Sequence, residues 1–378
     1  MVRILVADLI HEESIDTLRS MGHDVYLKPT MNEKEFAEAV EHCEILIVRS
    51  KKVTKAILQN AGSLILIIRA GSGVDTIDVN EASKKGIFVC NTPGMNSNAV
   101  AELAFGHILA CDRFIPTNSM MLRNGEWNKS KFANCFGLGS RTLGLIGCGN
   151  IAKNMIRIAK GFGMHVIVCS KPFSQSEAQS LGVEFAKDMF EVASSADVIS
   201  VHIPYIPGET HHVINRDFFN TMKDNSIFVN TSRGEIVDTE ALKDAIKNKG
   251  IKVGLDVFEN EPTGGKGVFI DTELANLVCS CTCHIGASTI ESLEKTSKET
   301  IRVIDQFLRT GRPDFCVNVE SILTTFGISS SNNNDKTPGI INGTSSNPIN
   351  LENYASIIKS QRILNDEHYQ IGSNNRIQ

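Results

Sequence analysis

Three short polar segments in the second half of the chain carry residues suited to acid–base and anion chemistry. Each follows an apolar run, and the three contribute Arg233, Glu261 and His284 in that order. An imidazole exchanges protons near neutral pH, a carboxylate beside it favours its protonated form, and a guanidinium grips a carboxylate and polarises a carbonyl oxygen. Taken singly, the three residues would also suit a strand-end cation, a loop acid before proline and a capping or core histidine. Together they predict proton transfer on a small anionic substrate.

A glycine-rich turn lies upstream of this trio. An apolar run at 142–146 leads into Gly147-Cys148-Gly149-Asn150-Ile151-Ala152, and a helical stretch follows. In such a turn the first glycine permits a tight bend and the second lets a pyrophosphate approach the backbone. The N–H groups at the helix start then face the phosphate. The segment predicts a dinucleotide site, with a glycine turn that binds no ligand as the alternative.

The next expected strand ends near Cys169, and Ser170 and Lys171 follow it. This is the position where an acid usually binds the ribose 2′-hydroxyl and repels a 2′-phosphate. A hydroxyl and an ammonium group lack that repulsion, and the ammonium group can hold a phosphate. We therefore expect NADP to be accepted as well as NAD, unless Lys171 is simply a solvated loop lysine.

Apolar runs that alternate with helical stretches position these segments. The runs lie at 2–7, 45–48, 64–68 and 87–90, and again at 142–146, 166–169, 198–202, 226–230, 253–256 and 277–281. This pattern predicts an α/β protein with two Rossmann-like or flavodoxin-like parallel-sheet domains. Ligands bind at the carboxyl ends of parallel strands, so the three polar segments are expected to converge on one cleft.

Two long helical segments are candidate hinges between the domains. One spans 98–122, where Pro116 is a potential break, and the other spans 288–308 with apolar residues spaced for one face.

From about 329 to 378 the chain becomes rich in Asn and Ser, which indicates a polar, disordered tail with one short helix at 351–364. A chain of 378 residues is long enough for two such domains.

The composition argues against a nucleic-acid-binding or membrane protein. A net charge of -5 gives no basic excess for binding nucleic acid or anionic lipid. No apolar stretch approaches the roughly 20 residues of a membrane span, and Asp8 interrupts the apolar N-terminus where a signal peptide would need an unbroken run. We expect a cytoplasmic protein with neither a membrane nor a nucleic-acid partner.

The ten cysteines are scattered without a disulfide framework, which favours a reducing compartment. The run Cys279-Ser280-Cys281-Thr282-Cys283-His284 allows a metal site. Alternation along a strand would place the three thiols on one face without the usual C-x-x-C pairing, so a packed strand end is preferred and no metal is expected.

The motifs together resemble the D-isomer-specific 2-hydroxyacid dehydrogenase family. The resemblance covers about 2–319 and is strongest at N-T-S-R-G-E-I-V-D (230–238), L-D-V-F-E-N-E-P (255–262) and H-I-G-A-S-T (284–289). Within the family the chain is most similar to the phosphoglycerate dehydrogenases, on the basis of V-R-S (48–50), R-A-G-S-G-V-D (69–75), N-T-P (91–93) and N-G-E-W (124–127). By this resemblance residues 1–97 with 286–320 bind the substrate, and 98–285 bind NAD or NADP.

The resemblance implies reversible hydride transfer at C2 of 3-phosphoglycerate and 3-phosphohydroxypyruvate, a reaction of serine biosynthesis. His284 is then the acid–base group, Glu261 its partner and Arg233 the grip on the substrate carboxylate. The implied cofactor contacts are Gly147, Gly149, Asn150, Ile151, Ser170, Lys171, Ile203, Thr231, Ser232, Asp256, Gly286 and Ala287. The expected substrate contacts are the backbone of Ser72 and Gly73, with Arg49 and Arg69 for the phosphate or, alternatively, for surface ion pairs.

Two departures from the family pattern bear on these roles. Cys283 replaces the usual proline before the histidine, and the ribose acid is missing. The polar tail is too short for a serine-binding regulatory module, so feedback through such a module is not expected. The alternatives are a glyoxylate or hydroxypyruvate reductase and, more remotely, a dinucleotide-sensing protein like the corepressors of the family. The segment 125–127 lies where relatives pair, so a homodimer is expected.

Overall fold

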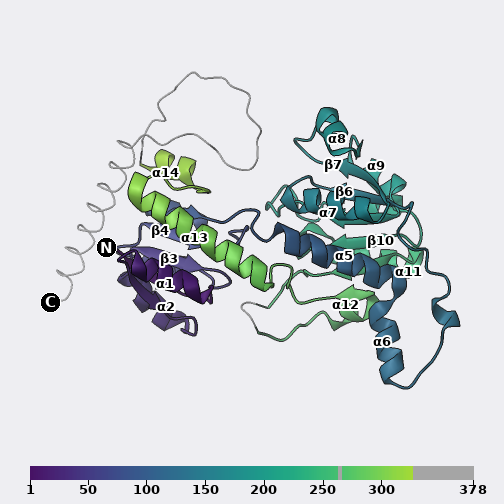
Figure 1. Cartoon of the computed structure of the whole chain (residues 1–378), viewed down its shortest axis with the longest axis horizontal. Coiled ribbons are helices and arrows are strands. Elements are labelled where there is room, and N and C mark those ends of the chain that lie inside the picture. Colours follow the sequence, from purple (N-terminus) through teal and green to yellow (C-terminus); the bar gives the residue numbers. More distant parts are fainter. Residues whose placement is uncertain (263–265, 327–378) are drawn as a thin grey trace. The chain divides into compact units, whose positions relative to one another are not determined.

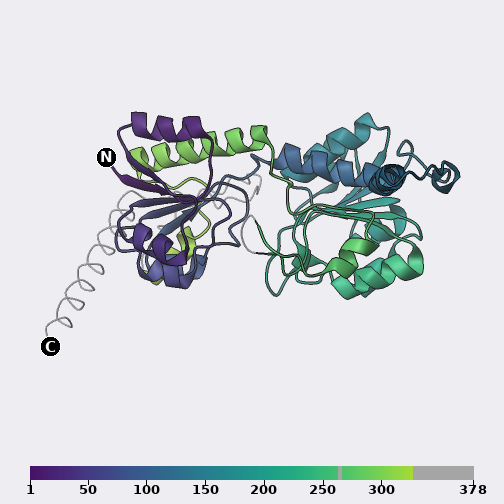
Figure 2. The same ribbon diagram turned by 90° about the horizontal axis from the view of Figure 1, so that it is seen from below.

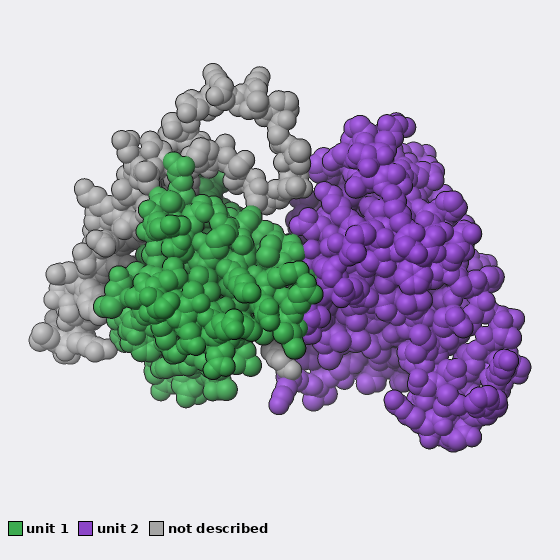
Figure 3. All heavy atoms as spheres, in the orientation of Figure 1, with its two compact units in different colours: residues 1–96, 290–378 green, residues 97–289 purple. Residues whose placement is uncertain are grey.

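The computed structural model describes residues 1–262 and 266–326, which form two compact units (Figures 1 and 3). Unit 1 comprises Met1–Asn96 and the described residues from Ile290, and unit 2 comprises Ser97–Thr289. The predicted tail at 329–378 and its short helix lie outside the described residues. Among those that are described, no helix has the length and apolar character to cross a membrane.

Unit 1 contains a parallel five-stranded sheet in the order β2-β1-β3-β4-β5, which is the flavodoxin-like order. The strands are β1 (Arg3–Val6), β2 (Asp24–Leu27), β3 (Ile45–Val48), β4 (Leu66–Arg69) and β5 (Phe88–Cys90). The apolar runs predicted four of them. They missed β2 because it is an edge strand in which only Val25 is buried, so it has no apolar run to detect.

Helices cover both faces of this sheet. They are α1 (Glu12–Ser20), α2 (Glu33–Glu41), α3 (Lys55–Gln59), α4 (Val79–Lys84), α13 (Ile290–Thr310) and α14 (Val319–Thr325). Figure 2 shows α1 and α13 side by side on one face. There Val303, Ile304 and Phe307 of α13 join the same buried cluster as Ile4 and Val6 of β1. The predicted helix at 288–308 is thus confirmed, and it belongs to unit 1 although 199 residues lie between the end of β5 and its start in the sequence.

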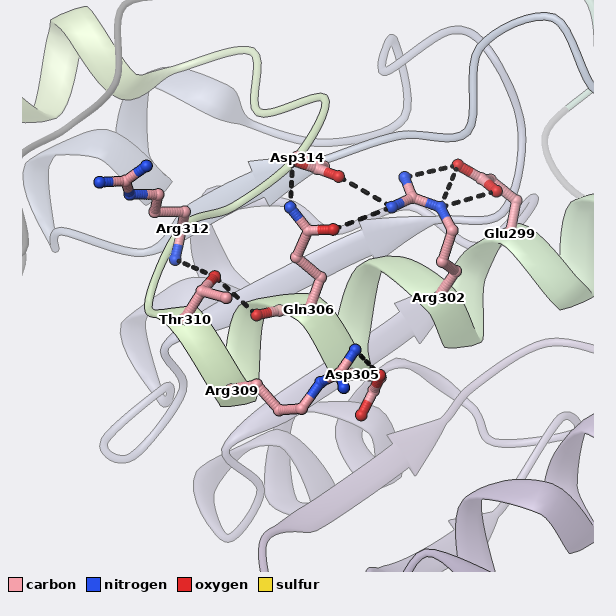
Figure 4. A network of polar contacts seen from close by, with 8 residues as sticks. All are labelled: Glu299, Arg302, Asp305, Gln306, Arg309, Thr310, Arg312 and Asp314. Carbon is pink, nitrogen blue, oxygen red and sulfur yellow. Dashed lines mark hydrogen bonds and ion pairs between the residues drawn. The ribbon is translucent and has the colours of Figure 1, made fainter.

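A polar network at the end of α13 fixes the chain that returns to the sheet (Figure 4). Arg302 binds Glu299 and donates to Gln306 and Asp314, and Gln306 also donates to Asp314 at 2.9 Å. Beyond this network, the buried Asn318 side chain accepts from Val89 N at 2.9 Å. The returning segment is therefore tied to β5, which leads directly into the loop at 91–96.

Unit 2 contains a parallel seven-stranded sheet in the order β12-β11-β10-β9-β6-β7-β8. The strands are β6 (Thr142–Ile146), β7 (His165–Cys169), β8 (Glu184–Phe185), β9 (Val198–Val201), β10 (Ile227–Asn230), β11 (Lys252–Leu255) and β12 (Ser280–Cys281). This is the Rossmann order with one added edge strand, and the strand order reverses between β6 and β9. The predicted fold class, with two parallel α/β sheets, is confirmed.

Two details of the second sheet differ from expectation. The short strand β8 was not predicted, and the run at 277–281 is not one strand, because Leu277 ends α12 (Thr272–Leu277) and only Ser280–Cys281 pair with β11. The thiols near this strand do not share one environment. The Cys279 thiol interacts with the buried Cys111, which lowers the pKa of Cys279, whereas Cys281 and Cys283 are exposed.

The segment at 98–122 forms two helices, α5 (Ser97–Arg113) and α6 (Ile115–Arg123). They divide at Phe114, which has a φ of 51°, and Pro116 lies in the first turn of α6, as expected for a proline that cannot continue a helix. The remaining helices of unit 2 are α7 (Asn150–Gly161), α8 (Gln175–Leu181), α9 (Met189–Ser195), α10 (Arg216–Thr221) and α11 (Thr239–Lys249).

Candidate active site

A histidine–glutamate pair lies beyond the carboxyl ends of β11 and β12. His284 Nδ1 is 2.7 Å from Glu261 Oε2, while Glu261 Oε1 accepts from Phe258 N at 2.9 Å. The carboxylate is thus anchored to its own loop and orients the imidazole. Within the described residues His284 Nε2 has no hydrogen-bond partner, and the side chain is 46% exposed. This nitrogen is available to exchange a proton.

The buried carboxylate of Asp256 shapes the backbone around His284. It accepts hydrogen bonds from Thr282 Oγ1 at 2.6 Å, Ile285 N at 2.8 Å and Gly286 N at 2.8 Å, and His284 N donates to its carbonyl oxygen at 2.8 Å. Asp256 is 1% exposed, so these bonds are made in a low-dielectric interior. They hold His284 in a left-handed conformation with a φ of 53°. The structure thus shows that Asp256 positions His284. The contact of Asp256 with the carboxamide of the nicotinamide remains a prediction.

Arg233 follows β10 in a turn that Asn230 organises. Asn230 Nδ2 donates to Arg233 O at 2.8 Å, and Asn230 Oδ1 accepts from Ser232 N at 2.9 Å and Ser232 Oγ at 2.7 Å. Arg233 Nη1 donates to Ser232 O at 2.7 Å. The half-buried guanidinium is therefore held near the backbone of its own turn, at the same end of the sheet as His284.

Close backbone packing joins the Arg233 turn to the Glu261 loop. A Cβ atom on Gly234 would overlap with the carbonyl carbon and oxygen of Phe258, so only glycine allows this approach. Phe258 N is also the donor that anchors Glu261. The structure thus brings the loops of all three predicted catalytic residues together within unit 2.

The predicted dinucleotide turn lies where the strand order of the second sheet reverses. Gly147 has a φ of +100°, and a Cβ atom there would overlap with His202 O at the end of β9. Gly149 is the N-cap of α7 and has no atom within 4 Å of its Cβ position, so the start of this helix is open to a ligand. Ile203 lies beside the turn, with its Cγ2 3.1 Å from the Cβ position of Gly147.

Among the other predicted cofactor residues, Thr231 and Ser232 are buried at the end of β10. Thr231 Oγ1 has no hydrogen-bond partner among the described residues. A buried hydroxyl without a partner is costly, so Thr231 fits a ligand that supplies one. Together with the open helix start, this hydroxyl fits the binding of a dinucleotide along the carboxyl ends of the strands.

Ser170 and Lys171 follow β7, where Ser170 is half-buried and Lys171 exposed. A carboxylate does lie near this strand end, because Asp188 adds to burial in raising the pKa of the Cys169 thiol. Asp188 is the N-cap of α9 and accepts from Glu191 N at 2.9 Å. This acid is therefore engaged with its own helix.

The predicted substrate residues of unit 1 gather at the carboxyl ends of β3 and β4. Asp8, which sequence reasoning missed, accepts from the N–H groups of Arg49 at 2.6 Å, Ser50 at 3.0 Å and Lys51 at 2.9 Å. Arg69 Nε donates to Arg49 O at 3.1 Å. Asp8 thereby fixes the backbone that holds both arginines. The only sequence signal for it was an acid directly after an apolar run.

The glycine-rich loop at 71–73 lies beside Arg69. A Cβ atom on Gly71 would overlap with the Arg69 guanidinium, so this side chain passes close over the loop. Asn91 Nδ2 donates to Ser72 O at 2.6 Å, and Ser72 Oγ donates to Asn96 Oδ1 at 2.9 Å. Asn91 belongs to the N-T-P motif (91–93), which by itself assigns it no role, and the structure shows that it positions the loop.

The unit 2 sequence matches the model of a known domain family. Residues 105–286 match the D-isomer specific 2-hydroxyacid dehydrogenase, NAD binding domain. Whole-chain comparison finds a D-3-phosphoglycerate dehydrogenase of Methanocaldococcus jannaschii that is 38% identical over 324 residues, covering 85% of this chain and 60% of the relative. The chain thus spans less than two thirds of that relative.

A relative of similar length is a hydroxypyruvate reductase of Thermotoga maritima, which is 37% identical over 304 residues, covering 80% of this chain and 97% of the relative. Among solved structures, the NAD⁺-bound 3-phosphoglycerate dehydrogenase of Entamoeba histolytica matches with a TM-score of 0.70 and 26% identity. That match covers 84% of this chain and 98% of the other. The relatives thus carry the names of two different substrates.

Proposed function

Because this chain belongs to the D-isomer-specific 2-hydroxyacid dehydrogenase family, we propose that it transfers a hydride between NAD(P) and C2 of a small 2-hydroxy or 2-keto acid. The observation that carries the proposal is the 2.7 Å contact between His284 Nδ1 and Glu261, which leaves His284 Nε2 open to a substrate. The contact lies beside the Arg233 turn, in the unit that also holds the dinucleotide turn.

The chain's own residues supply binding and proton transfer. Gly147, Gly149 and the start of α7 would hold the pyrophosphate of the dinucleotide, with Thr231 further along the strand ends. When bound, the nicotinamide supplies the hydride to C2 of a keto acid or accepts it from a hydroxy acid. In the reductive direction His284 Nε2 donates a proton to the C2 oxygen.

The charged groups around His284 have complementary roles. Glu261 accepts the hydrogen bond from Nδ1, so it selects the ring orientation and stabilises the imidazolium that donates the proton. Arg233 binds the substrate carboxylate and stabilises the negative charge that develops on the C2 oxygen. One hydride and one proton convert the ketone to the alcohol, and the reverse reaction returns both.

We propose 3-phosphohydroxypyruvate as the keto substrate. Asp8 and the Arg69–Arg49 hydrogen bond hold two guanidinium-bearing residues at one edge of the unit 1 sheet, which suits a phosphate dianion. The test is nicotinamide oxidation with 3-phosphohydroxypyruvate, hydroxypyruvate and glyoxylate, measured for wild type and Arg69→Ala. We expect the Arg69→Ala variant to have a KM for 3-phosphohydroxypyruvate that is at least tenfold higher than that of wild type. Its KM values for hydroxypyruvate and glyoxylate should rise less than twofold. Equal turnover of all three by wild type would favour the reductase alternative.

We propose that NADP is used at least as well as NAD, because Ser170 and Lys171 follow β7 in place of an acid. Lys171→Ala should raise the KM for NADPH by about tenfold, the effect of losing roughly 1.4 kcal/mol of phosphate binding, and leave the KM for NADH unchanged. An unchanged KM for NADPH would contradict this assignment.

We also propose that the protein forms a homodimer through α6 and the segment after it, which Figure 1 shows extending from unit 2. The exposed large apolar side chains there include Ile115, Met120, Leu122, Trp127 and Phe136. Such a concentration marks an association surface. Trp127→Ser with Phe136→Ser should yield a monomer in analytical ultracentrifugation, whereas an unchanged dimer would place the interface elsewhere.

A further inference from the structure

A second histidine–glutamate pair lies on the same loop as Glu261. Glu259 Oε1 is 2.6 Å from His212 Nε2, and Glu259 Oε2 accepts from Thr239 Oγ1. Asn260 separates the two acids and has a φ of +57°. This left-handed residue turns the chain, so that Glu259 and Glu261 bind different histidines.

The partners of Glu259 come from two other segments of unit 2, a loop and the start of a helix. His212 lies in the loop between β9 and α10, and Thr239 is the first residue of α11, which follows the Arg233 turn. His212 N also donates to Glu235 O at 3.0 Å, so His212 is bound at both its backbone and its ring. The Glu259 carboxylate therefore joins its own loop after β11 to the loop after β9 and to the start of α11, through the two oxygen atoms of one side chain.

The His212 ring is restrained further by its neighbours. It stacks on His211 with a centroid distance of 3.9 Å and an interplanar angle of 20°, and His211 meets Tyr205 edge to face. Glu259 is 23% exposed and His212 is 38% exposed, so neither belongs to a freely solvated surface pair. A carboxylate with both oxygens engaged by partners on separate loops is more restraining than an exposed ion pair between mobile side chains.

We propose that Glu259, together with His212 and Thr239, is a positioning group for the catalytic residues. It fixes the loop that carries Glu261 against the turn that carries Arg233, and so sets the place of the His284 ring relative to the substrate carboxylate. The inference rests on the proposed dehydrogenase function. Catalysis is sensitive to shifts of about 1 Å in such groups, so loosening this link should reduce kcat more than ground-state binding.

The test compares Glu259→Ala with Glu259→Gln and Thr239→Val with Thr239→Ser. Glutamine retains an acceptor for Thr239 and a donor for a neutral His212, and serine retains the hydroxyl group. We expect Glu259→Ala to lower kcat at least tenfold and Thr239→Val about threefold to tenfold. The KM for the nicotinamide cofactor should stay within twofold of wild type, and both conservative variants should stay within threefold. Glu209→Ala is the matched control, because Glu209 is an exposed acid in the same loop as His212.

A second readout keeps the inference separate from the proposed function. Amide hydrogen exchange of Glu259→Ala should increase in 231–239 and 256–262, while the five strands of unit 1 keep wild-type protection. If wild type turned over no 2-keto acid while Glu259→Ala still showed this exchange pattern, the proposed reaction would be wrong, but the role of Glu259 in joining the loops would stand. Wild-type kcat in Glu259→Ala would overturn the positioning role. So would a kcat in Glu259→Gln and Thr239→Ser as low as in Glu259→Ala and Thr239→Val.

Discussion

The two histidine–glutamate pairs whose acids lie on the loop at 257–262 share their chemistry but differ in what surrounds them. Both histidines have left-handed backbones, with φ of 53° at His284 and 50° at His212, and both lie within 2.7 Å of a carboxylate oxygen. Glu261 uses its second oxygen on Phe258 N of its own loop, whereas Glu259 uses its second oxygen on Thr239, the first residue of α11. One pair is anchored locally and the other joins loops.

The two rings differ in their neighbours. Each leaves one nitrogen without a hydrogen-bond partner in the described part of the chain, Nδ1 in His212 and Nε2 in His284, but only the His212 ring is stacked on another ring, that of His211. An imidazole serves as a proton donor only if one nitrogen can reach the substrate, and it serves as a link best when its ring is held. Two glutamates of one short loop thus pair with histidines of different use, His284 for proton transfer and His212 for positioning.

The largest expected effect comes from neutralising the acid of the catalytic pair. Glu261→Gln removes the charge that stabilises the imidazolium, and we expect kcat to fall by about 100-fold or more. Glu259→Gln, the matched substitution two residues earlier, should stay within threefold. Steady-state kinetics with NADPH and the best keto acid checks both. Equal losses in the two variants would remove the distinction between the pairs.

A second substitution should disturb both pairs at once. Gly234→Ala introduces a Cβ atom that overlaps with the Phe258 backbone, which carries the anchor of Glu261. We expect a loss of about 1–3 kcal/mol in the free energy of unfolding and a lower kcat. Gly139→Ala is the control, because its nearest neighbour would be 3.8 Å away. Chemical denaturation gives the comparison, and wild-type stability for Gly234→Ala would show that the two loops are not packed as described.

The smallest effect concerns His202, a histidine that has no carboxylate partner. Its Nε2 lies 2.9 Å from Ser200 Oγ, its Nδ1 has no partner in the described residues, and burial lowers its pKa from 6.5 to about 3. Because the unfolded chain binds a proton below pH 6.5 and the folded protein does not, stability falls as the pH drops from 6.5 towards 3. The loss attributable to this group is about 2 kcal/mol at pH 5.

His202→Gln should therefore reduce the difference in unfolding free energy between pH 7 and pH 5. Urea denaturation at both pH values measures it. His212→Gln, which changes a histidine with a carboxylate partner, is the comparison. An acid sensitivity that is unchanged in His202→Gln would show that the ring is protonated in the folded state or more accessible than its burial indicates.

The sequence predicted the parts of this molecule that depend on local pattern. Apolar runs identified the long buried strands, and the glycine turn between β6 and α7 was recognised from its spacing. The edge strands β2, β8 and β12 were missed or misplaced because they bury few side chains. Periodicity reports burial, so an element that buries little gives little signal.

In the candidate site, too, residues in local motifs were predicted and residues that depend on tertiary contacts were missed. Arg233, Glu261 and His284 were singled out because each sits in a short motif of known type, and their roles remain predictions for the kinetic tests. Glu259 lies within such a motif at a position to which the resemblance assigns no role, and His212 lies outside these motifs. Their contact depends on a left-handed turn at Asn260 and on a loop 47 residues away in the sequence, neither of which follows from spacing.

The most direct test of the central claim is a single-turnover experiment on His284→Ala with bound NADPH. Nicotinamide fluorescence first establishes that the variant binds the cofactor as wild type does, and a 2-keto acid is then added by rapid mixing. Wild type should oxidise the bound NADPH rapidly, and the variant should do so at least about 100-fold more slowly at unchanged cofactor affinity. Oxidation at the wild-type rate in His284→Ala would contradict the assignment of His284 as the proton donor.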